Sequence, residues 1–195
     1  VYTWLLEQGE NHFGVKINNV ILAGDSAGGN LVAALTIMAI KLNYKLPLAN
    51  ILSYPALYVG ANIFVPSLLL SLDDILLPSK FLKGAISAYL GNPPEELEYL
   101  KPEQQELLCP IVSDEHILSK FPKTLIQISQ NDPLRDFGVQ FALKLKKAGA
   151  DVKISEHMNV PHGLLNMNSN IFELKNESNL MILEVVHFIE TLNHA

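Results

Sequence analysis

Several residue types are scarce in this chain of 195 residues, and each shortage excludes a class of protein. Cys109 is the single cysteine, which excludes a disulfide within the chain and fits a reducing compartment. Lysine and arginine are few, and the net charge of -6 leaves no basic stripe for the phosphates of a nucleic acid. No apolar run reaches the roughly 18 residues of a membrane helix, so we expect no transmembrane segment.

The sequence also lacks an initiator methionine and a signal peptide, because it begins at Val1 with the pattern of an amphipathic helix. That pattern predicts a helix from Tyr2 to about Gly9, where the glycine ends it. We therefore expect residues 1–195 to be a fragment or an excised domain rather than a complete gene product. The hydrophobic content of 49% is enough for a large core and argues against disorder.

Apolar runs that alternate with helical segments predict an α/β protein with a mostly parallel sheet. The expected strands are residues 20–25, 49–54, 124–129 and 151–157, the last of them at an edge. The first is a continuous apolar run, which is typical of a strand buried on both faces. The later helices are expected at residues 30–42, 80–90, 137–148 and 178–192. In the last of these, four apolar residues recur at helical spacing and are expected to face the core: Leu180, Leu183, Val186 and Ile189.

The stretch from about residue 56 to residue 119 interrupts this alternation. Prolines punctuate it, and residues 66–78 are rich in leucine. An acidic group at Glu95, Glu96 and Glu98 follows. This composition predicts an insertion of helices and loops above the sheet rather than another strand–helix unit.

The segment Gly24-Asp25-Ser26-Ala27-Gly28 follows the first apolar strand and precedes a helix. It has the G-x-S-x-G pattern in the strand–turn–helix setting of a nucleophile elbow. Such an elbow holds its serine in a strained backbone conformation, and we expect side chains at Gly24 or Gly28 to collide with neighbouring backbone. Ser26 is therefore the candidate nucleophile. The alternative is a glycine-rich turn that only connects a strand to a helix.

A serine hydroxyl needs a base within hydrogen-bond reach, and the base needs an orienting acid. In enzymes with a nucleophile elbow, the three catalytic residues follow along the chain in the order serine, acid, histidine, and each lies past the end of a strand. Asp132 directly follows the strand at residues 124–129, on the edge of a parallel sheet where ligands bind. It is the candidate acid, and a helix N-cap is its alternative role. Asp136 is the alternative acid, although its place before the expected helix suits an N-cap better.

His162 lies between Pro161 and Gly163, in a loop past the last expected strand. The proline restrains the backbone and the glycine permits a tight bend, so the histidine can reach back over the strand ends. His162 is the candidate base, and an ordinary surface histidine is the alternative. His157 and His162 do not suggest a metal site, because no third ligand clusters with them. We expect neither a metal nor a cofactor.

Three motifs of this sequence resemble those of the hormone-sensitive lipase family of α/β-hydrolases. The segment from Gly24 to Asn30, which includes Gly29, is similar to the family's nucleophile motif. The acid and histidine motifs have their counterparts in Asp132-Pro133-Leu134 with Asp136 and in Pro161-His162-Gly163. The leucine-rich residues 66–78 add to the resemblance, which runs from about Tyr2 to Leu165.

The resemblance implies a fold and a set of roles. The fold is the C-terminal part of an α/β-hydrolase catalytic domain without its early strands, with a mostly parallel sheet flanked by helices and a helical cap insertion at about residues 58–118. Ser26 is implied as nucleophile, Asp132 as acid, His162 as base and the N–H of Ala27 as an oxyanion donor. Residues 58–108 are implied as cap and acyl pocket. The family's H-G-G-G oxyanion segment does not occur in the sequence, so we expect residues 1–195 alone to be weakly active. The family's early strands are implied to pair with the strand before Ser26, and without them its unpaired edge is expected to make residues 1–195 poorly soluble.

The implied function is a carboxylic ester hydrolase, a lipase or esterase that acts on lipid esters such as acylglycerols or sterol esters. The implied location is cytoplasmic, with association at a lipid-droplet or membrane surface. Nucleic acid is not an expected partner. Two alternatives stay open on the same fold: a non-catalytic receptor for small molecules, and an inactive fragment.

Overall fold

The computed structural model describes residues 1–59, 65–71, 74, 76–91, 100–166 and 172–192. Its strands are β1 (Ile21–Asp25), β2 (Ala49–Ser53), β3 (Lys123–Asn131) and β4 (Val152–Pro161). Its helices are α1 (Tyr2–Phe13), α2 (Ala27–Lys41), α3 (Pro66–Leu70), α4 (Ser79–Leu90), α5 (Pro102–Leu108), α6 (Glu115–Leu118), α7 (Arg135–Lys147) and α8 (Phe172–Leu192). Two short 3₁₀ turns, η2 (Pro110–Val112) and η3 (Leu164–Asn166), complete the described elements.

The four described strands form one parallel sheet in the order β1-β2-β3-β4. The register pairs Gly24 with Leu52, Leu52 with Ile126, and Ile126 with Ile154. All four strands therefore end at the same edge of the sheet, which brings the loops after β1, β3 and β4 together. The predicted parallel α/β arrangement is confirmed, and β4 is at the predicted edge.

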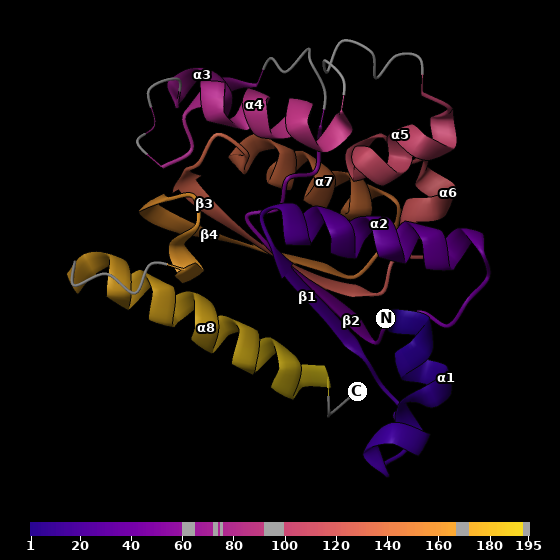
Figure 1. The fold of residues 1–195 in the computed structure, drawn as a ribbon. Coiled ribbons are helices and arrows are strands. Elements are labelled where there is room, and N and C mark those ends of the chain that lie inside the picture. Colours follow the sequence, from indigo (N-terminus) through magenta and orange to yellow (C-terminus); the bar gives the residue numbers. More distant parts are fainter. Residues whose placement is uncertain (60–64, 72–73, 75, 92–99, 167–171, 193–195) are drawn as a thin grey trace.

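Helices cover both faces of this sheet (Figure 1), with α2 and α7 on one face and α8 on the other. Alternation along the strands supplies apolar side chains to both layers. Leu52 and Ile126 lie in the larger core with Phe141 of α7, whereas Ile51 and Leu125 pack with residues of α8. The sheet is thus the middle of three layers, and its strand ends are held from both sides.

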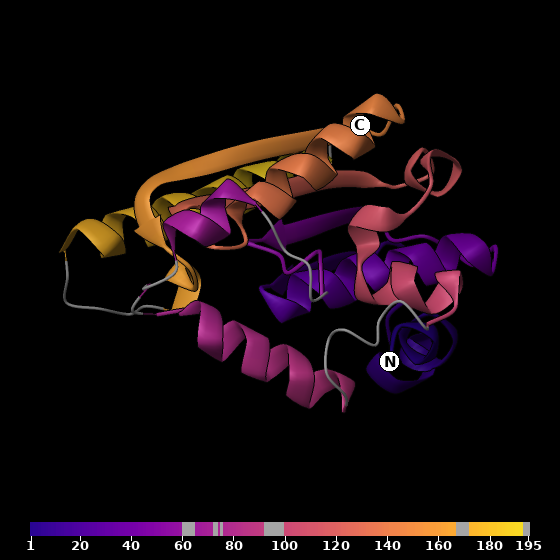
Figure 2. The ribbon, with the colours of Figure 1, turned by 90° about the horizontal axis from the view of Figure 1, so that it is seen from above.

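The predicted insertion is present as helices, and α3 and α4 lie above α2 and α7 in Figure 1. The view from above in Figure 2 shows α4 (magenta) to one side of α7. The predicted helix at residues 80–90 is found as α4, with proline at the position before its first residue. The side chain of Asn30 ties α2 to this region, because its Nδ2 donates to the carbonyl oxygens of Ala56 at 2.7 Å and Leu108 at 2.9 Å. The acidic group at residues 95–98 lies outside the described residues.

The first helix is longer than predicted, because Gly9 does not end it. Gly9 is buried inside α1, and a side chain there would lie 2.9 Å from Cδ1 of Ile17. The glycine therefore serves close packing rather than termination. Gly14 ends the helix instead, with a positive φ of 71° and its N–H donated to the carbonyl oxygen of Glu10.

The prediction that the first strand is buried on both faces is wrong. β1 is half-buried and Ala23 is exposed. Its place in the sheet gives the reason, because among the described residues β1 pairs with β2 alone. A continuous apolar run therefore marked a strand that has one neighbour among the described residues.

The predicted core face of the last helix is also wrong. Leu180, Leu183 and Val186 are 51%, 61% and 45% exposed, and Ile189 is partly buried. The face that packs on the sheet carries instead Met181, which is fully buried, and Phe188, which is 3% exposed. Both sets repeat at helical spacing, so periodicity alone did not distinguish them.

Candidate active site

The turn between β1 and α2 holds Ser26 in a strained conformation. Its φ is 52° and its ψ is -119°, outside the regions that residues with a side chain usually occupy. Its N–H donates to the carbonyl oxygen of Ser53 at 2.9 Å, and its own carbonyl oxygen accepts from Ala56 N–H at 3.0 Å. These bonds from the neighbouring strand end hold the turn, so Ser26 stands clear of the sheet at the start of α2.

The glycines of the elbow have unequal steric roles. A side chain at Gly24 would overlap the backbone carbonyl of Gly28, and one at Gly29 would come within 2.7 Å of Cβ of Pro55. A side chain at Gly28 would meet nothing nearer than Oδ1 of Asp25, at 3.9 Å. The predicted collision is therefore confirmed at Gly24 and wrong at Gly28. Gly29, rather than Gly28, is the second position where the space forbids a side chain.

The loop after β3 places Asp132 with its carboxylate buried. The residue is 1% exposed, and Oδ1 accepts the N–H of Leu134 at 2.7 Å, which makes a local turn of the kind that aspartate favours. The second oxygen, Oδ2, lies 2.8 Å from Nδ1 of His162. One oxygen of Asp132 thus fixes the side chain in its own loop, and the other faces the histidine.

The loop after β4 brings His162 between the serine and the aspartate. Its Nε2 lies 2.8 Å from Oγ of Ser26, across 136 residues of sequence. Strand β4 continues to Pro161, beyond its predicted end, and Gly163 turns the chain with a φ of 79°. The structure therefore joins Ser26, His162 and Asp132 in one continuous line of hydrogen bonds. This is the geometry of a serine nucleophile, its base and an orienting acid.

The alternative acid, Asp136, is bonded elsewhere. Its Oδ2 accepts the backbone N–H of Ser67 at 2.9 Å, and its Oδ1 pairs with Nη1 of Arg135 at 2.8 Å. The expected role as N-cap of its own helix is wrong as well, because α7 begins at Arg135 and Asp136 already lies in its first turn. The carboxylate instead connects α7 to α3 of the insertion.

A pocket of about 340 Å³ opens beside Ser26, between the start of α2 and helix α4. Apart from Ser26, Ala27 and Asn30, its lining is apolar: Leu31, Ala56, Val59, Leu77, Phe81, Leu82, Ala85, Ile86, Tyr89 and Leu134. Ala27 is the first residue of α2, and the first N–H groups of a helix have no acceptor within it. A bound carbonyl at this pocket would therefore meet Ser26 and a helix N-terminus together.

The structure adds Tyr54 and Asn30 to the residues predicted from the motifs. Tyr54 follows β2, and its ring packs against the ring of His162 with centroids 5.0 Å apart. Asn30 lines the pocket and holds the loop after β2. The sequence carried one signal for each: an aromatic residue directly before Pro55 at a strand end, and an asparagine in the first turns of an apolar helix.

Histidine, cysteine and acidic side chains of the described residues do not gather into a metal site. Within that part of the chain, no group of three or more histidine, cysteine, aspartate or glutamate side chains could hold a metal ion. His157 is buried on the α8 side of the sheet, where it lies 3.5 Å from carboxylate oxygens of both Glu177 and Glu184. As for the membrane, none of the helices described has the length and apolar character that a crossing requires.

The chain is similar in sequence and in fold to proteins named as ester hydrolases. Residues 1–166 match the model of a family described as "alpha/beta hydrolase fold". The chain is similar to an ethyl acetate hydrolase of Pseudomonas putida, with 28% identity over 186 residues that cover 95% of this chain and 54% of that protein. It thus spans about half the length of this curated relative.

Solved structures of esterases have the same fold as this chain. The carboxyl esterase 2 of Tuber melanosporum superposes with a TM-score of 0.79 at 28% identity, over 92% of this chain and 56% of that one. An esterase of Pyrobaculum calidifontis gives a TM-score of 0.80 at 26% identity, over 99% and 58% of the two chains.

Proposed function

The chain belongs to the α/β-hydrolase fold family whose model matches residues 1–166, and from that membership we propose that the full-length protein is a serine carboxylic-ester hydrolase. One observation carries the proposal. Oγ of Ser26 lies 2.8 Å from Nε2 of His162, and Nδ1 of the same ring lies 2.8 Å from Oδ2 of Asp132. Relatives named as esterases support the same reaction class.

In the proposed reaction Ser26 attacks the carbonyl carbon of the ester while His162 takes the proton of the hydroxyl. Asp132 holds the ring so that Nε2 faces the serine, and its charge stabilises the imidazolium that forms. The proton then passes to the alcohol oxygen as the carbon–oxygen bond breaks, which leaves an acyl group on Ser26. Water, deprotonated by His162, attacks this acyl group and releases the carboxylic acid.

The negative oxygen of the intermediate is proposed to bind the N–H of Ala27 at the start of α2. Helix N-termini favour such charge, because their first N–H groups and their dipole both point at it. Members of the hormone-sensitive lipase family, which this sequence resembles, supply further hydrogen-bond donors to the oxyanion from an H-G-G-G segment. Residues 1–195 do not contain such a segment. We therefore propose that the complete oxyanion hole forms in the full-length protein.

The proposed substrates are lipid esters such as acylglycerols or sterol esters. The apolar lining of the pocket beside Ser26 supports them, because it can receive an acyl chain but offers few polar partners. The leucine-rich residues 66–78, which resemble hormone-sensitive lipase itself, add to this proposal. Association of a cytoplasmic protein with a lipid-droplet or membrane surface would bring such substrates within reach.

We also propose how residues 1–195 divide into a catalytic domain and a cap. Residues 1–195 form part of an α/β-hydrolase catalytic domain, with a cap at about residues 58–118. Helix α4 supports this division, because Phe81, Leu82 and Ile86 close the pocket over the start of α2.

Labelling with a fluorophosphonate probe tests the proposed nucleophile. We expect the full-length protein to react at Ser26, as located by peptide mass spectrometry, and to hydrolyse p-nitrophenyl butyrate. Ser26→Ala should lose both properties. Ser119→Ala is the matched control, because the Ser119 hydroxyl is exposed and donates to the carbonyl oxygen of His116.

Two results would contradict the proposal. Labelling that persists in Ser26→Ala would place the nucleophile elsewhere. Binding of an ester or of a small ligand by the wild-type protein, without turnover of any p-nitrophenyl ester, would favour a non-catalytic receptor. A series of acyl chain lengths on the same chromophore would then separate lipid esters from short-chain esters.

A further inference from the structure

Tyr54 occupies a strained and fully enclosed position at the end of β2. Its side chain is 1% exposed, and its φ of 36° is a left-handed conformation that bulky residues rarely adopt. Its backbone N–H donates to the carbonyl oxygen of Gln127 at 2.7 Å, which holds the residue against β3. Strained residues of this kind persist where the surroundings determine them strongly, and they gather at functional sites.

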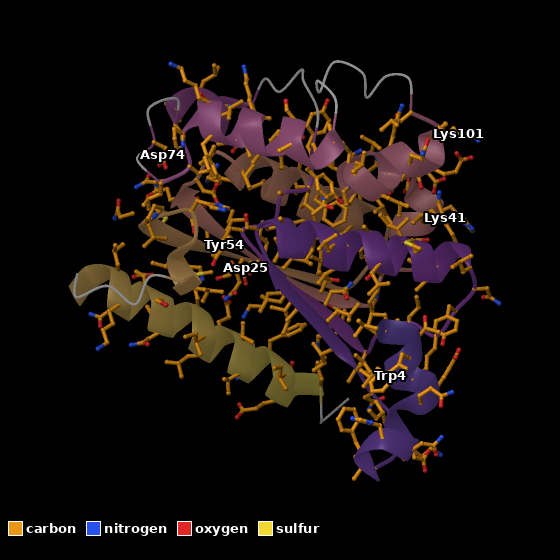
Figure 3. The ribbon with its side chains drawn as sticks, in the orientation of Figure 1. Trp4, Asp25, Lys41, Tyr54, Asp74 and Lys101 are labelled. Atoms are coloured by element: carbon orange, nitrogen blue, oxygen red, sulfur yellow. The ribbon has the colours of Figure 1, made fainter. Side chains whose placement is uncertain are left out.

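The hydroxyl of Tyr54 connects the elbow with the segment that follows His162. It accepts the N–H of Leu165 at 3.2 Å and points its own proton at Oδ2 of Asp25, 3.4 Å away. Figure 3 shows Tyr54 and Asp25 next to each other where the strands end. A phenol has one proton to donate and lone pairs that accept, so a single side chain makes both contacts. Burial, together with the nearby charge of Asp25, raises the pKa of Tyr54, which keeps the phenol protonated.

The ring of Tyr54 supports His162 directly. The two rings meet edge to face, with centroids 5.0 Å apart and planes inclined by 64°. Val160 and Leu164, which flank the histidine in sequence, are 1% and 0% exposed and belong to the same buried cluster as Tyr54. Residues on both sides of His162 therefore pack in one buried cluster with Tyr54.

We infer that Tyr54 is a positioning residue for His162. Its ring fixes the orientation of the imidazole, and its hydroxyl links Leu165, in the segment after His162, to Asp25, which precedes Ser26. The inference rests on the proposed ester hydrolysis. Small displacements of a catalytic base cost rate rather than substrate affinity, because they misplace it against the reacting atoms. Tyr54 does not line the pocket beside Ser26, so its loss is expected to leave substrate binding unchanged.

Tyr54→Phe separates the hydroxyl from the ring. It keeps the ring contact with His162 but removes both hydrogen bonds, so we expect kcat per active site to fall about tenfold with KM within a factor of two. Tyr54→Leu removes the ring contact as well and should lower kcat about 100-fold. Tyr44→Phe is the matched control, since it removes an exposed tyrosine hydroxyl that is bonded to Glu7, far from the site.

The experiment uses the full-length protein and p-nitrophenyl butyrate. Active sites are counted by titration with a fluorophosphonate, so a loss of folded protein lowers the count and not the kcat per site. A thermal melt of each variant records stability. Should Tyr54→Leu fail to fold, the nearly isosteric Tyr54→Phe decides the question alone.

The possible results separate the two proposals. If the wild-type protein hydrolyses no ester, the proposed function fails and the inference about Tyr54 falls with it. If the wild-type protein is active and Tyr54→Phe matches it in kcat per site, only the inference fails. A rise in KM at unchanged kcat would overturn it as well, because it would make Tyr54 a substrate-binding residue.

Discussion

The carboxyl end of the sheet and the helical insertion above it are held together in different ways. At the sheet end, polar side chains have partners at fixed atoms: Asp132 bonds Leu134 and His162, and His162 bonds Ser26. In the insertion, α4 is attached mainly by apolar side chains, and Val59, Ile86 and Cys109 form a small buried cluster of their own. The first region is fixed by hydrogen bonds between specific atoms, and the second presents apolar side chains to the pocket beside Ser26.

Ser67 connects the insertion to the sheet end through polar contacts. Ser67 of α3 donates its backbone N–H to Asp136 and its hydroxyl to the carbonyl oxygen of Pro133, at 2.9 Å each. Both acceptors lie in or beside the loop that carries Asp132. Ser67 therefore anchors α3 at the acid loop. Other parts of the insertion are bonded to α2, by Asn30 at the carbonyl oxygens of Ala56 and Leu108 and by the ion pair of Lys41 with Glu106. If this contrast is correct, changes at the sheet end should alter rate, and changes in α4 should alter substrate choice.

The largest effect is expected from His162→Gln. The variant removes the proposed base, and loss of the base in a serine hydrolase lowers kcat by ~10⁶-fold. The control is His187→Gln, since His187 is exposed on α8 and lies 3.9 Å from the carboxylate of Glu190. Activity on p-nitrophenyl butyrate is the measurement. If the His162→Gln variant kept more than a tenth of the wild-type kcat, His162 would not be the catalytic base.

Asp132→Asn is expected to lower kcat by ~10⁴-fold, because an amide facing Nδ1 favours the wrong tautomer of the histidine. The matched control is Asp136→Asn, a neighbouring carboxylate bonded to Ser67 and Arg135 instead. Steady-state kinetics of the two variants compare the carboxylates directly. Equal losses in both would show that the loop as a whole, and not the contact with His162, matters.

Gly24→Ala and Gly28→Ala compare the two glycines of the G-x-S-x-G pattern. The first is expected to destabilise the protein by about 3 kcal/mol or more, because its methyl group has no room beside the carbonyl of Gly28. The second is expected to be neutral or to stabilise by up to about 1 kcal/mol, because alanine favours a helix more than glycine does. Urea denaturation measures both, and equal destabilisation would contradict the steric account.

The smallest effect is expected in the insertion, from Phe81→Ala. Phe81 lines the pocket and is 64% exposed, so its loss should leave the fold intact. We expect kcat/KM to fall about tenfold for p-nitrophenyl octanoate and to stay unchanged for the acetate. Phe13→Ala is the control, because Phe13 of α1 is 55% exposed outside the pocket. An equal fall in kcat/KM for esters of every chain length would show that α4 affects the reaction rate rather than substrate choice, and would contradict the contrast between the two regions.

Local patterns were enough to predict most of the fold. The apolar runs at β1, β2 and β3 and the helices around them were found within a few residues, and the predicted α/β-hydrolase fold is confirmed. The order of Ser26, Asp132 and His162 along the chain also named the residues that the structure brings together. Their catalytic roles stay a prediction until the variants above are measured.

Other features depended on neighbours that no local pattern contains. Gly9 was taken for a helix end, but it is the site where Ile17 packs against α1. The exposed stripe of Leu180 and Leu183 repeats as regularly as the buried one of Met181 and Phe188. The choice between such faces depends on which side of the helix meets the sheet, and a helical period is the same on either side.

The sequence by itself determined the strand–turn–helix with Ser26, the order of the acid and the base, and the parallel sheet that gathers them. These follow from short-range rules: glycine where a turn needs it, and apolar runs where strands are covered. Only the tertiary structure decided that Gly29 and not Gly28 is sterically required, that Asp136 bonds Ser67, and that the ring of Tyr54 packs against that of His162. Each of these is a contact between distant parts of the chain, and its distance is set by packing.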